Sequence, residues 1–198
     1  MSYIYIILLL IGSYLLGSIP FAYLLTKIVK KIDIRTVGSK NPGATNVMRS
    51  VSKRLGLTVL LLDFLKGFIP VFISMRFFPD KASTIIAILS GILTVCGHNW
   101  PVFLKFSGGK GVATSAGVCI ALIPVDSIIV ILIFVSIWSI TRYISLGSIV
   151  AAVLLPAICW LTKKPAEISI FITIIGLAVI YRHKSNIKRL ITGTENKL

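Results

Sequence analysis

Acidic residues are scarce in this sequence, whose 198 residues include six Asp and Glu against 21 Lys and Arg. Cysteine is also scarce: Cys96, Cys119 and Cys159 lie far apart and form no C-x-x-C pair. We therefore interpret them as small hydrophobic residues rather than metal ligands or disulfide partners, and we expect no metal and no cofactor. No basic segment precedes the first apolar run and no small-residue cleavage pattern follows it, which argues against a removable signal peptide.

Apolar residues are abundant instead, at 56% of the chain, and the mean hydropathy is +0.96. Because several apolar runs approach the ~20 residues that cross a bilayer, the sequence predicts an all-α integral membrane protein with one membrane-embedded domain over residues 1–198. Seven transmembrane helices are expected, at Tyr3–Thr26, Leu55–Phe78, Ser83–Val95, Val112–Val125, Ser127–Ile140, Ser145–Leu161 and Ile168–Tyr181. A 14-residue helix covers only about 21 Å of a hydrocarbon core about 30 Å thick, so some spans are expected to be short or partial.

The distribution of Lys and Arg predicts the orientation of the chain. With seven spans and the N-terminus outside, 16 of these cations fall on the cytoplasmic side and four outside, with Lys66 inside a span. The positive-inside rule then places the C-terminus in the cytoplasm. Much of this charge can serve topology and attraction to anionic lipid rather than a site, and no nucleic acid partner is expected.

A polar loop, GSKNPGATN at Gly38–Asn46, follows the first apolar run on the cytoplasmic side. Pro42-Gly43 favours a tight turn with Gly43 at a positive φ, after which Ala44–Arg49 can begin a helix. Arg49 then offers a guanidinium fork suited to a phosphate. The local pattern fits an ordinary helix-capping loop equally well.

Three further polar clusters fall on the same side: Gly97–Thr114, Arg142–Ser148 and His183–Glu195. Together with the first loop they offer glycine backbone, hydroxyls, amides and cations but few carboxylates, an inventory that suits a phosphate ligand. Lys110 lies within GGKG, but a nucleotide-binding P-loop would need Gly at Leu104 and a hydroxyl at Gly111, so an ATPase is excluded. A glycine-rich turn that only packs against neighbouring helices is the alternative.

Helical spacing places His183 and Asn186 on one face of the last cluster and Lys184 and Lys188 on the other, so the first two can turn inward. A solvated cytoplasmic helix is the alternative. Asp63 and Lys66, three residues apart in the second span, would be costly in lipid, and we expect them to pair inside the bundle.

Six motifs carry a family resemblance. They are GSIP at Gly17–Pro20, R-x-x-G-S-x-N-P-G-A-T-N-x-x-R from Arg35, D-x-x-K-G from Asp63, G-H-x-x-P-x-F-x-x-F-x-G-G-K-G-V-A-T from Gly97, S-L-G-S from Ser145, and H-x-x-N-I-x-R-L-x-x-G-T-E from His183. In this order and over the whole chain, they closely resemble the bacterial acyl-phosphate:glycerol-3-phosphate acyltransferases of the PlsY type. Lys40 is a departure, because the family's pattern usually has a small residue there, commonly glycine.

The resemblance implies an enzyme of the bacterial inner membrane, with its active site facing the cytoplasm. It would transfer an acyl chain from acyl phosphate to position 1 of glycerol 3-phosphate, giving lysophosphatidate and phosphate in the first step of phospholipid synthesis. Its expected partners would be these two substrates, membrane lipid and the upstream enzyme that forms acyl phosphate.

The resemblance also implies site residues. Those with catalytic roles are Ser39, Arg49, Lys110 and His183, and those that bind substrate are Gly38, Asn41, Gly43, Thr45, Asn46, Gly109, Ser148 and Asn186. Arg49 and Lys110 are expected to neutralise phosphates and Ser39 to bind the donor phosphate. Ser148, His183 and Asn186 are expected to bind glycerol 3-phosphate. We expect the leaving phosphate, rather than a histidine, to take the proton from the attacking hydroxyl.

Two other functions remain open at this point. The acyltransferase motif H-x-x-x-x-D is absent, since the fifth residue after His98 is Phe103 and after His183 is Lys188. An anion or phospholipid transporter would explain several spans and buried cations, although no internal repeat is evident and all four polar clusters fall on one side. A phosphate-binding membrane scaffold without chemistry is the second alternative.

Overall fold

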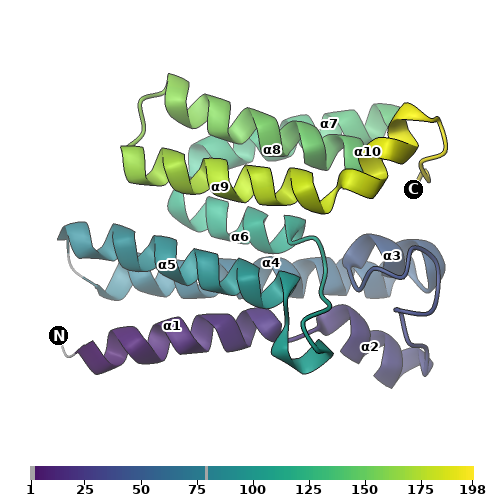
Figure 1. Ribbon diagram of the computed structural model, residues 1–198, viewed down its shortest axis with the longest axis horizontal. Helices are drawn as coiled ribbons and strands as arrows, with labels where there is room; N and C mark the ends of the chain where they lie inside the picture. Colours follow the sequence, from purple (N-terminus) through teal and green to yellow (C-terminus); the bar gives the residue numbers. More distant parts are fainter. Residues whose placement is uncertain (1–2, 79) are drawn as a thin grey trace. The chain divides into compact units, whose positions relative to one another are not determined.

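The computed structural model describes residues 3–78 and 80–198, without the side chains of 80–82, and over these residues the regular structure is helical (Figure 1). It consists of ten α-helices and one short 3-10 helix within the described ranges. The chain folds into two compact units, Met1–Leu122 and Ile123–Leu198. The prediction of an all-α protein is confirmed.

The first unit is built around its longest helix. Its elements are α1 (Tyr3–Ser18), α2 (Phe21–Lys30), α3 (Ala44–Ser50), α4 (Lys53–Phe77), α5 (Asp80–Asn99), the 3-10 helix η1 (Val102–Leu104) and α6 (Val112–Leu122). Helix α4 packs against both α5 and α6, while α1 lies along α5 (Figure 1). Short α3 packs on the beginning of α4 and carries the polar loop that precedes it.

The second unit consists of three long helices and one short helix, in which consecutive long helices pack against each other. Its elements are α7 (Pro124–Thr141), α8 (Ile144–Leu161), α9 (Ala166–Arg182) and α10 (Lys184–Ile191). Helix α8 packs against α7 on one side and α9 on the other, and α10 contacts α8 and α9. The tail that follows α10 returns to the beginning of α8, where Glu195 accepts a hydrogen bond from Ser145 and the N–H of Leu198 donates to the carbonyl of Arg142.

Both units place many apolar side chains outside and small polar ones inside. Leu8 and Leu177 are more than half exposed, whereas Ser74, Ser90 and Thr94 are fully buried. The Ser74 and Ser90 hydroxyls lie 3.1 Å apart and join α4 to α5. This distribution suits lipid contact, because hydrocarbon accepts apolar surface freely while small and polar residues hold membrane helices together.

Glycines allow the helices of the first unit to approach closely. A Cβ on Gly67 would overlap the carbonyl oxygen of Thr114, and one on Gly117 would overlap that of Phe64. These two contacts join α4 and α6 from both sides. Small residues at such crossings are typical of membrane helix pairs.

Among the described residues, four helical segments are long and apolar enough to cross a membrane, or up to six if each bent pair counts as one span. The bent pairs are α1 with α2, at 45°, and α9 with α10, at 59°. Helix α6 is apolar but has 11 residues, which cover about 17 Å. Each of the seven predicted segments falls on helical structure, with two of them crossing a break, while the number of spans and the orientation of the termini stay predictions.

Two predicted boundaries are wrong for reasons that involve proline. The segment Tyr3–Thr26 is broken after Ser18, because Pro20 lacks an N–H and disfavours the helical conformation of Ile19. The segment Val112–Val125 ends at Leu122, and Pro124 begins the next helix.

Candidate active site

The polar loop between α2 and α3 is shaped by one buried side chain, Asn46, which is 3% exposed. Its amide nitrogen donates to three carbonyl oxygens at 3.1 to 3.2 Å, those of Ile34, Val37 and Asn41. Its Oδ1 accepts the N–H of Ser39 at 3.0 Å. Asn46 therefore organises the loop, a role that the sequence did not indicate, and its assignment to substrate stays a prediction.

The turn within this loop differs from the predicted one. Gly43 has a φ of −139° and is the extended N-cap of α3, so the prediction of a positive φ there is wrong. The left-handed residues are Gly38, at 57°, and Lys40, at 58°. Lys40 thus adopts the conformation that glycine favours, at a position where the family pattern was expected to have a small residue, commonly glycine.

Helix α3 begins at Ala44, as predicted, and presents Arg49 in its second turn. A small apolar core holds α3 against α2 and α4 and consists of Ala22, Ile34, Ala44, Val47 and Val59. Arg49, Asn41, Gly43 and Thr45 are partly exposed, and Gly38 and Ser39 are exposed. The backbone of the loop and the Ser39 side chain are therefore accessible to solvent, while the apolar core holds the adjoining α3 in place.

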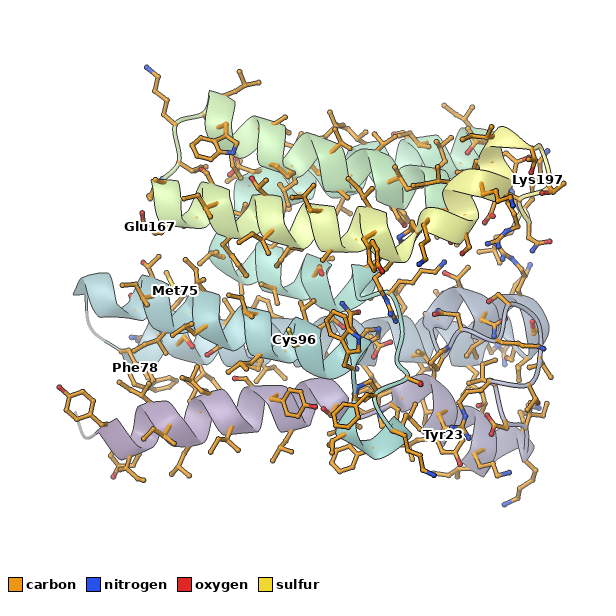
Figure 2. All side chains as sticks on the ribbon, viewed as in Figure 1. Tyr23, Met75, Phe78, Cys96, Glu167 and Lys197 are labelled. Atoms are coloured by element: carbon orange, nitrogen blue, oxygen red, sulfur yellow. The ribbon has the colours of Figure 1, made fainter. Side chains whose placement is uncertain are left out.

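Asp33 precedes this loop and is committed to Arg35, with 2.7 Å between Oδ2 and Nη2. The hydrogen bond from the Arg35 side chain lowers the pKa of Asp33 to about 2. The Arg35 guanidinium also stacks over the ring of Tyr23, which Figure 2 labels on α2, at 4.6 Å from its centroid. An ionised, paired carboxylate of this kind is a poor proton acceptor near neutral pH.

The glycine-rich loop that carries Lys110 is fixed to the end of α5. The N–H of Gly108 donates to the carbonyl of Asn99, and that of Gly109 to the carbonyl of His98, both at 3.2 Å. Gly111 has a φ of 80° and directly precedes α6. Lys110 is partly exposed between these anchored residues, at the beginning of α6 as predicted.

The two predicted phosphate loops meet at a small cavity of the first unit, with a volume of about 10 Å³, which is room for about one water molecule. Pro42 lines it from the first loop, and Gly108 and Gly109 line it from the second. The break between α1 and α2 supplies further lining residues, among them Ser18 and Pro20. Ser39 and Lys110 belong to these two loops and Arg49 to α3, but the three side chains are not among the residues that line the cavity.

Charged side chains form another wall of this cavity. Lys66 Nζ lies 2.8 Å from Asp63 Oδ1, which confirms the predicted pair, and both residues are buried. His98 Nδ1 lies 3.6 Å from the same oxygen. Sequence spacing indicated the pair within α4 but gave no sign of His98, because it comes from a different helix.

An apolar groove of about 300 Å³ adjoins the cavity. Both are lined by Ile19, Pro20 and Leu104. The groove adds Tyr23, Leu24 and Phe103. The first unit therefore places an apolar surface directly beside a polar one.

In the second unit, His183 lies at the junction of α9 and α10 and is 3% exposed. Its Nδ1 lies 2.8 Å from the carbonyl oxygen of Val179. Because a carbonyl only accepts, Nδ1 carries a proton, and in the neutral ring Nε2 is then the acceptor. The Nδ1 partner is a backbone group rather than a carboxylate, so it orients the ring without adding a charge.

Asn186 is held by a carboxylate that the sequence did not assign to the site. Glu195 Oε1 accepts hydrogen bonds from Asn186 at 2.8 Å and from Ser145 at 3.0 Å, and Arg189 Nε lies 2.8 Å from Oε2. Burial would raise the pKa of Glu195, but these hydrogen bonds outweigh it and hold the pKa below the ordinary 4.5. Glu195 is the last residue of the motif that begins at His183, which was a sign of its importance. Its position near the C-terminus gave no reason to expect a buried side chain.

Ser148 is buried one turn after Ser145 on α8, and its hydroxyl donates to the carbonyl of Ile144 at 2.9 Å. Lys184 and Lys188 are exposed while His183 and Asn186 are buried, so the prediction of two opposite faces is confirmed. The predicted site residues thus form one group in each unit. Their contacts with substrate stay predictions.

Known proteins resemble this chain over its whole length. A family model for glycerol-3-phosphate acyltransferase matches residues 7–193. The glycerol-3-phosphate acyltransferase of Thermoanaerobacter pseudethanolicus is 48% identical over 98% of this chain and 96% of its own length. That of Aquifex aeolicus is 42% identical over 96% of this chain and 97% of its own length.

Solved structures give the same result. The crystal structure of PlsY, an integral membrane glycerol 3-phosphate acyltransferase, in its glycerol 3-phosphate form has a TM-score of 0.91 at 41% identity, over 98% of this chain and 95% of PlsY. Its lysophosphatidic acid form has a TM-score of 0.88 at 40% identity, with the same shares covered. From the matched family model and these relatives, the chain belongs to the glycerol-3-phosphate acyltransferase family of the PlsY type.

Proposed function

We propose that this protein is an acyl-phosphate-dependent glycerol-3-phosphate acyltransferase, one catalytic domain in the inner membrane that forms lysophosphatidate on the cytoplasmic side. The observation that carries the proposal is the meeting of the two phosphate loops at one cavity beside an apolar groove. A donor with a phosphate head and an acyl tail has the same two-part chemistry. The PlsY relative, crystallised in glycerol 3-phosphate and lysophosphatidic acid forms, supports the choice of acceptor and product.

In this reaction the position 1 hydroxyl oxygen of glycerol 3-phosphate attacks the carbonyl carbon of acyl phosphate. The new ester bond forms, the carbonyl carbon to phosphate oxygen bond breaks, and inorganic phosphate leaves. Ser39 and its loop bind the donor phosphate, and Arg49 and Lys110 neutralise charge as the phosphate departs. Ser148, His183 and Asn186 bind glycerol 3-phosphate, and the upstream enzyme that makes acyl phosphate is the expected supplier.

The purified protein in lipid vesicles tests this function. Acyl phosphate and glycerol 3-phosphate should yield equal amounts of lysophosphatidate and phosphate, followed by mass spectrometry and phosphate release. Arg49→Ala and Lys110→Ala should each lower kcat/KM. The expected loss corresponds to about 2–4 kcal/mol of transition-state stabilisation. Lys53→Ala, an exposed cation at the start of α4, is the control and should change little. Substrate movement across the vesicle without product would instead favour a transporter.

We further propose that the leaving phosphate accepts the proton of the attacking hydroxyl. Three features support this: Asp33 is ionised and paired, Glu195 is occupied by three donors, and the backbone carbonyl on the Nδ1 of His183 supplies no negative charge to stabilise a protonated ring. The role of His183 is then to orient glycerol 3-phosphate through a hydrogen bond.

The pH profile of kcat separates this mechanism from histidine catalysis. His183→Ala should be slower through poorer positioning but should keep an acidic limb of the same shape. If His183 were the general base, which typically contributes ~10²–10⁴-fold, the limb would disappear together with most of the rate. That result would end the proposal of substrate-assisted catalysis.

A further inference from the structure

Three ionisable side chains lie buried together in the first unit without a role in the proposed reaction. The exposed fractions of Asp63, Lys66 and His98 are 3%, 2% and 8%. Lys66 Nζ and His98 Nδ1 both face Asp63 Oδ1, at 2.8 and 3.6 Å. Ionisable residues within a membrane helix are costly and usually serve function. We call them the Asp63 cluster.

The Asp63 cluster ties together three parts of the first unit. Asp63 and Lys66 belong to α4 and His98 to α5. Lys66 Nζ also donates to the carbonyl oxygen of Ile19, in the break between α1 and α2, at 3.0 Å. Each of these elements contributes to the cavity at which the two phosphate loops meet.

His98 connects the cluster to the glycine-rich loop in two ways. Its backbone carbonyl accepts the N–H of Gly109 at 3.2 Å. Its ring fills the space beside Gly109, so that a Cβ at that position would overlap Nε2. The residue immediately before Lys110 is therefore held by both the backbone and the side chain of His98.

We propose that Asp63, Lys66 and His98 are positioning residues for Lys110. The ion pair holds the His98 ring, the ring and carbonyl hold Gly109, and Gly109 fixes where the Lys110 ammonium begins. This inference rests on the proposed role of Lys110 in neutralising phosphate. The effect is large enough to measure, because a displacement of about 1 Å in a site can cost ~10²-fold in rate.

A double-mutant cycle between His98 and Lys110 tests the proposal, with kcat and both KM values measured on the full-length protein in lipid vesicles. His98→Ala should lower kcat/KM by about 10- to 100-fold in the wild type, but by less than about threefold when Lys110 is already Ala. Equal losses in both backgrounds would show a general structural effect and overturn the inference alone. No loss in Lys110→Ala itself would overturn both the inference and the proposed role of Lys110.

Two further variants keep the test independent of folding. Asp63→Asn preserves size and removes the charge that holds Lys66 and His98, and it should reproduce the coupling to Lys110. His98→Asn retains a nitrogen donor near the position of Nδ1 and should recover part of the activity lost in His98→Ala. Coupling absent in Asp63→Asn, or no recovery in a folded His98→Asn protein, would count against the proposal.

A size-exchange experiment examines the contact with Gly109 directly. Gly109→Ala should lower the activity, because the added Cβ would overlap the His98 ring. The double variant His98→Ala, Gly109→Ala lacks that ring and should recover part of the lost activity. Asp126→Asn is the matched control, since it breaks a 2.9 Å ion pair with Lys164 in the other unit. It should lower the Tm while leaving both KM values unchanged, and a KM change there equal to that of Asp63→Asn would refute a specific positioning role.

Discussion

Lys40 holds a left-handed backbone conformation, with a φ of 58°, in the loop that bears Ser39. This conformation costs a residue with a Cβ roughly 1–2 kcal/mol, whereas glycine adopts it readily. Lys40→Gly should therefore raise the free energy of unfolding by about 0.5–1 kcal/mol after the greater entropy of the unfolded chain is counted. The measurement is the Tm in detergent.

Lys40→Ala is the control for this prediction, because it removes the exposed charge but keeps the Cβ. It should not raise the Tm. If both variants stabilise the protein equally, charge repulsion rather than backbone conformation explains the effect.

Glu195 makes stability depend on pH in a defined direction. Its hydrogen bonds hold the pKa in the folded protein below the ordinary 4.5, so its contribution is present above pH 4.5 and is lost as the pH falls through the lower folded value. Glu195→Gln keeps an acceptor for Asn186 but loses the charge that pairs with Arg189. It should lower the Tm at pH 7, and the difference from wild type should shrink below pH 4.5.

Glu167→Gln is the comparison, because Glu167 is an exposed carboxylate at the start of α9, where Figure 2 labels it. Its Tm should match that of the wild type across the same pH range. A Glu195→Gln deficit that persists unchanged well below pH 4.5 would show that shape, not charge, is what the carboxylate contributes.

Sequence reasoning found residues better than it found their partners. The Asp63 and Lys66 pair was predictable because helix geometry alone brings positions three apart together. The hydrogen bond from Ser145 to Glu195 and the 3.6 Å contact between His98 and Asp63 join distant parts of the chain, and no local pattern encodes them. The backbone conformation of Gly43 was predicted wrongly, because its role as the extended N-cap of α3 outweighed the turn preference of Pro42-Gly43.

Among the helices, the crossing of α4 and α6 is the most sensitive to side-chain size. Gly117→Ala would place a Cβ on the carbonyl oxygen of Phe64, a backbone atom that cannot rotate away. Overpacking of this kind typically costs about 1–3 kcal/mol, so the Tm should fall. Gly12→Ala has open space around its Cβ and should leave the Tm unchanged or slightly higher.

Equal losses in the two glycine variants would indicate that the close contact between Gly117 and Phe64 is not what lowers the stability. The positions of the helices themselves were largely predictable, since an apolar run imposes a helix in a membrane whatever its neighbours. Their ends were less so. Proline breaks such as Ile19-Pro20 become visible only when backbone geometry is weighed against hydropathy.

The full chain offers one test that its helices cannot give separately, which is its orientation. On a background without Cys96, Cys119 and Cys159, Glu167→Cys should react with an impermeant thiol reagent in intact cells, and Thr194→Cys only after permeabilisation. Both positions are exposed. The prediction follows from the excess of cytoplasmic cations. The opposite labelling pattern would reject an outside N-terminus with seven spans.

Family and helical class were readable from the sequence over its whole length, because motifs and hydropathy are properties of the chain. The number of spans was less readable. Helix α6 is too short to span by itself, and bent pairs such as α1 with α2 can cross or re-enter. Length and composition leave both arrangements open, so labelling decides between them.

The ion pair of α4 also bears on how the protein is made. A charge at the centre of an inserting helix costs about 2.5–3.5 kcal/mol, and α4 carries two of them before α5 has left the ribosome. Asp63 and Lys66 lie on one face, 2.8 Å apart, and need no other helix to neutralise each other. The part of the nascent helix between Arg54 and Arg76 can therefore enter the translocon without net charge, and His98 can join the pair once α5 follows.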